Sequence, residues 1–514
     1  MVKKRILSVA FKSYQQHQAM LLPPSLDELV GQGHPVRTVN AVLDKINIDP
    51  VLKKYKGGGS SSFHPRMLLK ILVYAYINNT YSSRKIEAAL KENIHYMWLS
   101  GMSTPDHNTI NRFRGERLKD VLEKIFTEVV LLLAQEGLLT LKEVYTDGTK
   151  IEANANRYTF VWGKAIKTNR EKIKKQLSEL WQYAQRVAAS EMDDTDPSGF
   201  DKIDAEKVEQ TIEKINEALK NKEVNKTIKQ KLNYAKKNFP ANLKKYEQQE
   251  QILGEQRTSY SKTDPSATFM RLKEDHMKNG QLKPAYNVQL STNNQFITTY
   301  SLHQTSTDTT TLISHLEHHE KLFNQKPEVV TTDAGYGSEE NYQWLENNTI
   351  TAFVKHNQFD RAQNKTIRNK TPFSVDKLFY NKDQNCYYCP MGQKMKWVAT
   401  RTKKTSTGFK QVIHLYKAQK CEGCPLKGVC NKGKGNRTIE VNHNLTRLKQ
   451  KAEKLLLSEE GVKKRKQRPC DVEPAFANIK QNHHFRRFML RGIEKVTIEA
   501  GLLALAHNLR KKAA

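Results

Sequence analysis

The chain lacks any long apolar segment, which limits where it can act. Its longest apolar run, residues 68–77 (LLKILVYAYI), contains Lys70 and is far shorter than the roughly 20 residues that span a bilayer. The basic start, MVKKRILSVAF, has too short an apolar part for a secretory signal. We therefore expect no membrane partner and a cytoplasmic location.

Cysteines and acidic residues are also scarce. All six cysteines lie between Cys386 and Cys470, which suits a local metal site better than a disulfide framework. The 54 Asp and Glu residues face 85 Lys and Arg residues, giving a formal charge of +31. Such an excess predicts a large polyanion as partner. At 514 residues, the chain should fold as two or three structural units.

Residues 26–139 have apolar side chains at the three- and four-residue spacing of helices. Within them, SSRKIEAALKEN and PDHNTINRFRGERL each begin with a helix-start signal and are joined by IHYMWLSGM. Two interpretations remain open: a helix-turn-helix that reads DNA, or a plain helical bundle with a basic outer face.

Residues 164–256 are rich in charge and poor in aromatics, with apolar positions at helical spacing. This pattern predicts an inserted helical arm that resembles a coiled-coil hairpin. A polar break (SEMDDTDPSGFD, residues 190–201) should separate its helices.

Strand patterns flank this arm. KEVYTDGTKIEA carries Asp147, KPAYNVQLS and QFITTYSL should pair around a turn at residues 292–294, and PEVVTTDAGYGS should end its strand at Asp333. Helices are expected in STDTTTLISHLEHHEKLF, SEENYQWLENN, VEPAFANIKQNHHFRRFM and VTIEAGLLALAHNLRK, and a strand in TAFVKH. This succession of elements is that of a ribonuclease H-like fold.

Three carboxylates are candidates for a two-metal phosphoryl-transfer site, which needs acidic ligands from distant parts of the chain. Asp147 and Asp333 each close an apolar strand in this interpretation and have a glycine close behind. Glu473 should start a helix beside Pro474, with Lys480 two turns further on the same face. The alternative for any single Asp is an ordinary turn residue. We leave out Asp264 because it lies in an Asp-Pro turn signal.

Three segments resemble the catalytic blocks of bacterial insertion-sequence DDE transposases: YTDGTKIEANANRYTFVWGK, TTDAGYGSEENYQWL and VEPAFANIKQNHHFRRFMLRG. HPVRTVNAVLD, FHPRMLLKILVYAY and PDHNTINRFR resemble the helical N-terminal domain of that family. The resemblance implies that Asp147, Asp333 and Glu473 bind two Mg²⁺ (or Mn²⁺) ions, and that Arg468 and Lys480 accompany the glutamate. Relatives commonly carry a Tyr near that arginine, and KKRKQRPCDVE contains none.

By this resemblance, we expect the protein to cleave and join phosphodiester bonds at transposon ends and to associate with the bacterial nucleoid. Its partners would be double-stranded DNA, both ends and target, and a second copy in a homodimeric active complex. Further basic residues expected to contact DNA are Arg84, Arg112, Arg114 and Arg487. Trp162 could stack on an unpaired base or belong to the core. The alternatives are a nuclease of the same fold and a DNA-binding regulator without catalysis.

The cysteine segment has the spacing of a tetrahedral zinc site. The pairs Cys386-x2-Cys389 and Cys421-x2-Cys424 are followed by Cys430, one cysteine more than zinc needs. Spacing favours the two pairs, whereas the family resemblance favours Cys389, Cys421, Cys424 and Cys430. Unligated thiols are the third possibility.

The expected fold class is therefore α/β, a ribonuclease H-like mixed sheet with an all-helical N-terminal domain and two insertions. We expect the N-terminal domain at residues 1–140, the first parts of the catalytic core at 141–164 and 257–360, and its C-terminal helices at 446–514. The helical insertion should occupy residues 165–256, and a zinc-ribbon-like cysteine-rich insertion residues 361–445.

Overall fold

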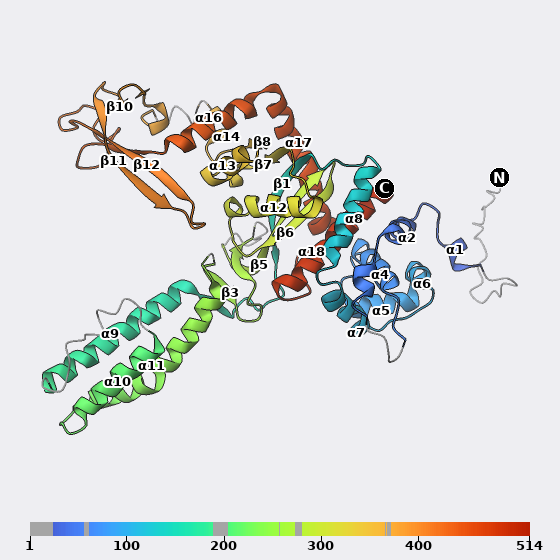
Figure 1. Ribbon diagram of the computed structural model, residues 1–514, viewed down its shortest axis with the longest axis horizontal. Helices are drawn as coiled ribbons and strands as arrows, with labels where there is room; N and C mark the ends of the chain where they lie inside the picture. Colours follow the sequence, from blue (N-terminus) through green and yellow to red (C-terminus); the bar gives the residue numbers. More distant parts are fainter. Residues whose placement is uncertain are drawn as a thin grey trace, which may run out of the picture.

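The computed structural model describes residues 24–55, 61–188, 204–255, 257–272, 280–364, 366 and 372–514. A central mixed sheet lies between N-terminal helices on one side and two projections on the other, a helical arm and a small β-lobe (Figure 1). The expectation of a mixed α/β chain with a helical N-terminal region is confirmed. The polar break expected at residues 190–201 lies outside the described residues.

The N-terminal part is helical, as the spacing of its apolar residues predicts. Its helices are α1 (Leu26–Leu29), α2 (Pro35–Lys45), α3 (Asp49–Leu52), α4 (Pro65–Ile77), α5 (Ser83–Glu92), α6 (Ile94–Ser100), α7 (His107–Arg112) and α8 (Leu122–Gln135). The apolar run is the buried helix α4, whose Lys70 pairs with Asp44 at 2.6 Å. The segment expected to link two helices is itself α6, so α5 and α7 are not joined by a simple turn.

The central sheet combines both strand directions. Its strands are β1 (Glu143–Glu152), β4 (Thr268–Arg271), β5 (Leu282–Asn293), β6 (Phe296–His303), β7 (Val329–Thr332) and β8 (Thr351–Val354). The order across the sheet is β6-β5-β1-β7-β8, with β4 beside the start of β5. Strands β1, β7 and β8 are parallel, whereas β5 is antiparallel to β1 and to β6. The β5–β6 turn has positive φ at Asn294 and Gln295.

Helices cover both faces of this sheet. They are α12 (Leu312–Phe323), α13 (Glu339–Asn347), α14 (Phe359–Gln363), α16 (His443–Leu457), α17 (Glu459–Ala477) and α18 (Ile493–Ala513). Helix α18 packs against β6 and also against α4 and α8. One apolar core therefore joins the N-terminal helices, α18 and the β5–β6 face. A second core lies between β1, β7, α12, α13 and α16.

The expected start of a helix at Glu473 is wrong. Helix α17 begins at Glu459 and runs through Pro469 and Pro474, so Glu473 lies near its end. The proline was interpreted as a first-turn residue, but it occurs inside the helix. Beyond α17, the π-helical turn η7 (Asn478–Asn482) carries Lys480.

The described residues of the arm are helical, as predicted, and form α9 (Gly163–Val187), α10 (Ala205–Leu219) and α11 (Lys226–Leu253). They enclose their own core around the buried Trp181. Strands β2 (Phe160–Trp162) and β3 (Ser259–Ser261) pair at its base. There Trp162 lies beside Phe160 and Phe269, with ring centroids 5.9 and 6.1 Å away.

The cysteine segment folds as an antiparallel sheet in the order β13-β12-β11-β10-β9. Its strands are β9 (Tyr380–Asn381), β10 (Cys386–Tyr388), β11 (Lys394–Lys404), β12 (Lys410–Ala418) and β13 (Thr438–Val441). The sheet has its own small apolar core, which includes Met395 and Tyr416. Among the residues that the structure describes, no helix is long and apolar enough to cross a membrane.

Candidate active site

Asp147 and Asp333 lie at the same edge of the central sheet. Strands β1 and β7 run parallel, with Tyr145 opposite Thr331, and each aspartate follows two residues after this pair. Asp333 directly follows β7, as predicted. Asp147 does not close its strand, because β1 continues to Glu152 in antiparallel pairing with β5. Asp147 therefore lies just beyond the point where the pairing of β1 with β7 ends, while the pairing of β1 with β5 continues.

Arg468 joins Asp147 to Glu473. From α17, its guanidinium Nη1 donates to Asp147 Oδ2 at 3.0 Å, and its Nη2 lies 4.0 Å from Glu473 Oε1. The Asp147 and Arg468 side chains are 16% and 18% exposed, whereas Glu473 is 62% exposed. Arg468 therefore links Glu473 to Asp147.

Two contacts fasten α17 over the sheet. The Asp471 carboxylate is buried and accepts hydrogen bonds from Thr292 Oγ1 at 2.7 Å and from the Gln295 backbone N–H at 3.1 Å. Lys464 pairs with Glu143 of β1 at 2.6 Å. These contacts hold the part of α17 that carries Arg468 and Glu473 against β1 and β5.

A divalent cation is implied by the resemblance, and the side chains at this edge have suitable donors. Carboxylate oxygens are the ligands that Mg²⁺ prefers. The Arg468 guanidinium, itself a cation, is held between Asp147 and Glu473 and marks where positive charge is favourable. Within the described residues, however, no three His, Cys, Asp or Glu side chains form a group that could hold a metal ion.

A third aspartate near this edge was missed by sequence reasoning. Asp308, in the 3₁₀ turn η4 (Asp308–Thr310), approaches the glycines that follow Asp147 and Asp333. Its segment, STDTTT, was expected only as the beginning of a helix. No local pattern identifies it, because its neighbours come from strands that pair across the sheet.

The predicted basic contacts have different surroundings. Arg84 and Arg112 are exposed on the N-terminal helices. Arg487 is exposed, but its side chain also donates to the carbonyl oxygens of Ala153 and Ala155 at 3.1 and 3.3 Å. Arg114 is only 3% exposed and donates to the Tyr81 carbonyl oxygen at 2.7 Å. It therefore supports the fold of the N-terminal helices.

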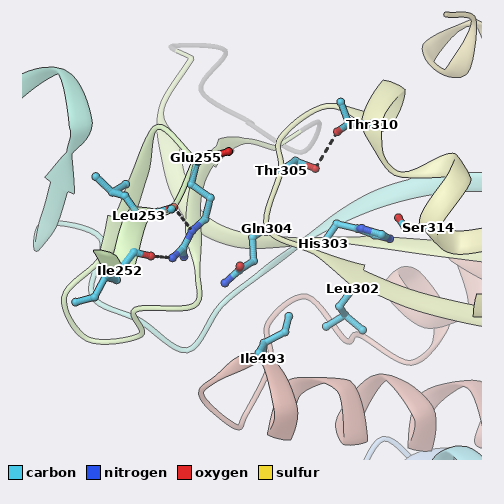
Figure 2. A pocket seen from close by; sticks show the side chains of 12 residues that line it. Ile252, Leu253, Glu255, Leu302, His303, Gln304, Thr305, Thr310, Ser314 and Ile493 are labelled. Carbon is cyan, nitrogen blue, oxygen red and sulfur yellow. Dashed lines mark hydrogen bonds between the residues drawn. The ribbon is translucent and has the colours of Figure 1, made fainter. Parts of the chain in front are cut away.

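A cavity of about 700 Å³ opens beside η4 (Figure 2). Its walls come from the end of α11, the end of β6, η4 and the start of α18, and include His303, Thr310 and Ile493. Arg257 borders it and donates to the carbonyl oxygens of Leu253 and Pro265 at 3.1 and 2.7 Å. This arginine therefore fastens the base of the helical arm.

The cysteines of the β-lobe divide into two environments. Cys386 is buried within β10, where its thiol faces Gln384 Oε1 at 3.9 Å. Cys389 Sγ instead accepts a hydrogen bond from the Gln393 backbone N–H at 3.3 Å, and Cys421 Sγ accepts one from the Arg437 backbone N–H at 3.4 Å. Cys430 Sγ accepts one from Arg437 Nη1 at 2.9 Å. Arg437 thus brings Cys421 and Cys430 together.

Two family models match separate parts of the chain. Residues 24–116 match a transposase domain (DUF772), and residues 388–513 match a transposase DDE domain. No curated protein and no solved structure gives a significant match. Both matched families are transposases, which indicates DNA transposition as the function. Together the two matches support the identification of this chain as a member of the insertion-sequence DDE transposases.

Proposed function

We propose that this protein cleaves and joins phosphodiester bonds at insertion-sequence ends by two-metal chemistry on a ribonuclease H-like core. The observation that carries the proposal is the meeting of Asp147 and Asp333 at one sheet edge, with Arg468 joining Asp147 to Glu473. The strand order β6-β5-β1-β7-β8, antiparallel in its first part and parallel in its second, supports the proposed fold.

The chemistry divides between the metal ions and the side chains. Two divalent ions held by Asp147, Asp333 and Glu473 would activate a water or a DNA 3′-hydroxyl and stabilise the leaving oxygen. Arg468 supplies a planar two-pronged contact for a phosphate, whereas Lys480 supplies a point charge. Arg468 reaches Asp147 from α17, and Lys480 follows in the turn η7.

The proposed partner is double-stranded DNA, both transposon ends and target. The formal charge of +31 and the exposed Arg84, Arg112 and Arg487 support this partner. Phosphate contacts provide affinity and position, whereas contacts to base edges provide specificity. Pairing of two ends calls for two copies of the chain, so we propose a homodimer in the active complex.

We also propose that the β-lobe binds one zinc ion through Cys389, Cys421, Cys424 and Cys430. Backbone N–H groups donate to the sulfurs of Cys389 and Cys421, and Arg437 donates to the sulfurs of both Cys421 and Cys430. Cysteine sulfur is a preferred ligand of zinc. Cys386 is left out because it is buried within a strand and has a different neighbour.

The test is cleavage and strand transfer on DNA that carries the element's own ends, with Mg²⁺ or Mn²⁺. We expect the wild-type protein to be active and Asp333→Ala to bind ends but neither cleave nor join them. The matched control is Asp383→Ala, because Asp383 is an exposed aspartate on the β-lobe.

Each outcome separates the competing functions. Equal activity of Asp333→Ala and wild type would exclude this carboxylate from the chemistry. Cleavage without strand transfer would favour a nuclease of the same fold. Tight end binding without any cleavage by the wild type would favour a DNA-binding regulator.

A further inference from the structure

Asp308 is held in place by two amide side chains of β5. Its Oδ1 accepts hydrogen bonds from Asn287 Nδ2 at 2.8 Å and from Gln289 Nε2 at 3.0 Å. Gln289 lies opposite Gly148, the residue after Asp147, in the β1–β5 pairing. The carboxylate is therefore fixed over the strand that carries Asp147.

The two glycines behind the aspartates leave room for this arrangement. A Cβ atom on Gly148 would lie 2.3 Å from Gln289 Nε2 and 2.7 Å from Asp308 Oδ1. A Cβ atom on Gly335 would lie 3.0 Å from Asp333 Oδ1 and 3.8 Å from Asp308 Oδ2. Asp308 thus sits between the glycines that follow the two candidate metal ligands, with Oδ2 towards the turn after Asp333.

Gln289 links Asp308 to that turn. The Gln289 side chain is completely buried, donates to Asp308 with its Nε2, and accepts a hydrogen bond from the Tyr336 hydroxyl with its Oε1. Tyr336 belongs to η5 (Ala334–Tyr336), directly after Asp333. Burial, followed by the negative charges of Asp308 and Asp147, raises the pKa of Tyr336 well above its usual range, so its hydroxyl remains a donor.

A second set of hydrogen bonds ties η4 to η5. Thr309 Oγ1 donates to the Gly335 carbonyl oxygen at 2.8 Å. Asn341 Nδ2 donates to the carbonyl oxygens of Thr309 and Tyr336 at 2.9 and 2.7 Å. The turn that begins with Asp308 and the turn that follows Asp333 therefore form one hydrogen-bonded unit.

We propose that Asp308 is a positioning residue of the candidate active site: through Gln289 and Tyr336 it fixes the turn that holds Asp333 beside Asp147. This role rests on the proposed two-metal function. Because Asp308 would act by placing Asp333, loss of the Asp308 carboxylate should weaken the binding of a divalent cation and slow the chemical step.

The test compares Asp308→Ala with Asp308→Asn. Asparagine keeps a carbonyl oxygen that accepts from Asn287 and Gln289, whereas alanine keeps none. A misplacement of about 1 Å can slow a reaction on the order of 100-fold. We therefore expect Asp308→Ala to lose about 100-fold in end cleavage, and Asp308→Asn to recover to within about 10-fold of wild type.

Direct Mn²⁺ binding, followed by electron paramagnetic resonance without DNA, gives a readout independent of activity. We expect a higher half-saturating Mn²⁺ concentration for Asp308→Ala and for Tyr336→Phe, which removes only the hydroxyl that reaches Gln289. If Asp308→Ala does not fold, Tyr336→Phe and Asp308→Asn carry the test. Ser306→Ala, an exposed neighbouring change, is the matched control.

The outcomes distinguish this inference from the proposed function. Wild type as inactive as Asp333→Ala would overturn the function itself. An active wild type, an inactive Asp333→Ala and an Asp308→Ala with unchanged Mn²⁺ binding and cleavage would overturn the role of Asp308 alone. Asp308→Asn as inactive as Asp308→Ala would also overturn it, because the hydrogen bonds would then be insufficient.

Discussion

At the scale of single residues, a chain of hydrogen bonds lies beneath the strand that carries Asp147. Thr146 Oγ1 contacts Ser291 Oγ at 2.7 Å, and Ser291 Oγ contacts His315 Nε2 at 2.8 Å. On the other side of the ring, His315 Nδ1 contacts Ser301 Oγ at 2.6 Å, which in turn contacts His303 at 2.7 Å. Thr146, Ser291 and His315 are completely buried, so the charge state of His315 matters for stability.

We predict that the protein loses stability as the pH falls from 6.5 towards 4. Burial lowers the pKa of His303 and His319 to about 4, and that of His315 well below its usual 6.5. Between these values the unfolded chain binds protons that the folded chain excludes. Each such histidine therefore removes about 1.4 kcal/mol of unfolding free energy per pH unit on acidification.

Urea unfolding at pH 7.5, 6.0 and 5.0 measures this effect. A lower midpoint at each step is the expected result. A midpoint that stays constant over this range would contradict the neutral, buried state of these rings.

At the scale of elements, the two projections carry cores of their own. The arm closes at its base where the Gly163 backbone N–H donates to the Thr258 carbonyl oxygen at 2.9 Å. The β-lobe is anchored to α13 through Glu339, which is buried and accepts from Gln411, Asn442 and Asn444 at 3.0, 2.6 and 3.0 Å. Each projection therefore has a core of its own and a defined attachment to the rest of the described chain.

For the β-lobe, we predict about one zinc ion per chain in the purified protein. Cys421→Ser and Cys424→Ser should lose it, because each removes a proposed ligand. Cys386→Ser, the matched control, should keep it. A colorimetric zinc assay after denaturation gives the content, and a zinc-free wild type or a zinc-free Cys386→Ser would contradict the proposed ligand set.

At the scale of the whole molecule, α18 connects the N-terminal helices to the sheet (Figure 1). Its Glu499 is completely buried and accepts from the backbone N–H groups of Met489 and Leu490 at 2.9 and 3.0 Å, and from the Tyr76 hydroxyl at 3.2 Å. Burial raises the pKa of Glu499, while the nearby positive charge of Arg114 opposes this rise. The Glu499 carboxylate therefore bonds both to the N-terminal helix α4, through Tyr76, and to the segment just before α18.

We predict that Glu499→Ala destabilises the entire protein. Each buried donor left without an acceptor costs about 1–3 kcal/mol, and the change strands several donors at once. Glu494→Ala is the matched control on the same helix, because Glu494 is 66% exposed and its ion pair with Lys119 is screened by solvent and contributes little. Urea unfolding should show a much larger loss for Glu499→Ala, and equal losses would contradict this role.

Local patterns predicted most helices and strands, because apolar residues recur at about 3.6 residues in a helix and at about two in a strand. The N-terminal helices, β7 ending before Asp333, and α18 all follow this rule. The wrong expectation of a helix start at Glu473 also came from a local pattern. Pro474 suggested a helix start near Glu473, yet packing and the buried Asp471 extend α17 through it.

The sequence by itself determined the order of the elements, the excess of positive charge, and Asp147 and Asp333 as candidates. Only the tertiary structure decided which side chains meet. Strand pairing across more than a hundred residues brings Asp308 over Gly148, and α17 brings Arg468 to Asp147. The tertiary structure also buries Arg114, which the sequence alone suggests as a DNA contact. Such contacts depend on which strands and helices become neighbours, and periodicity along the chain carries no information about that choice.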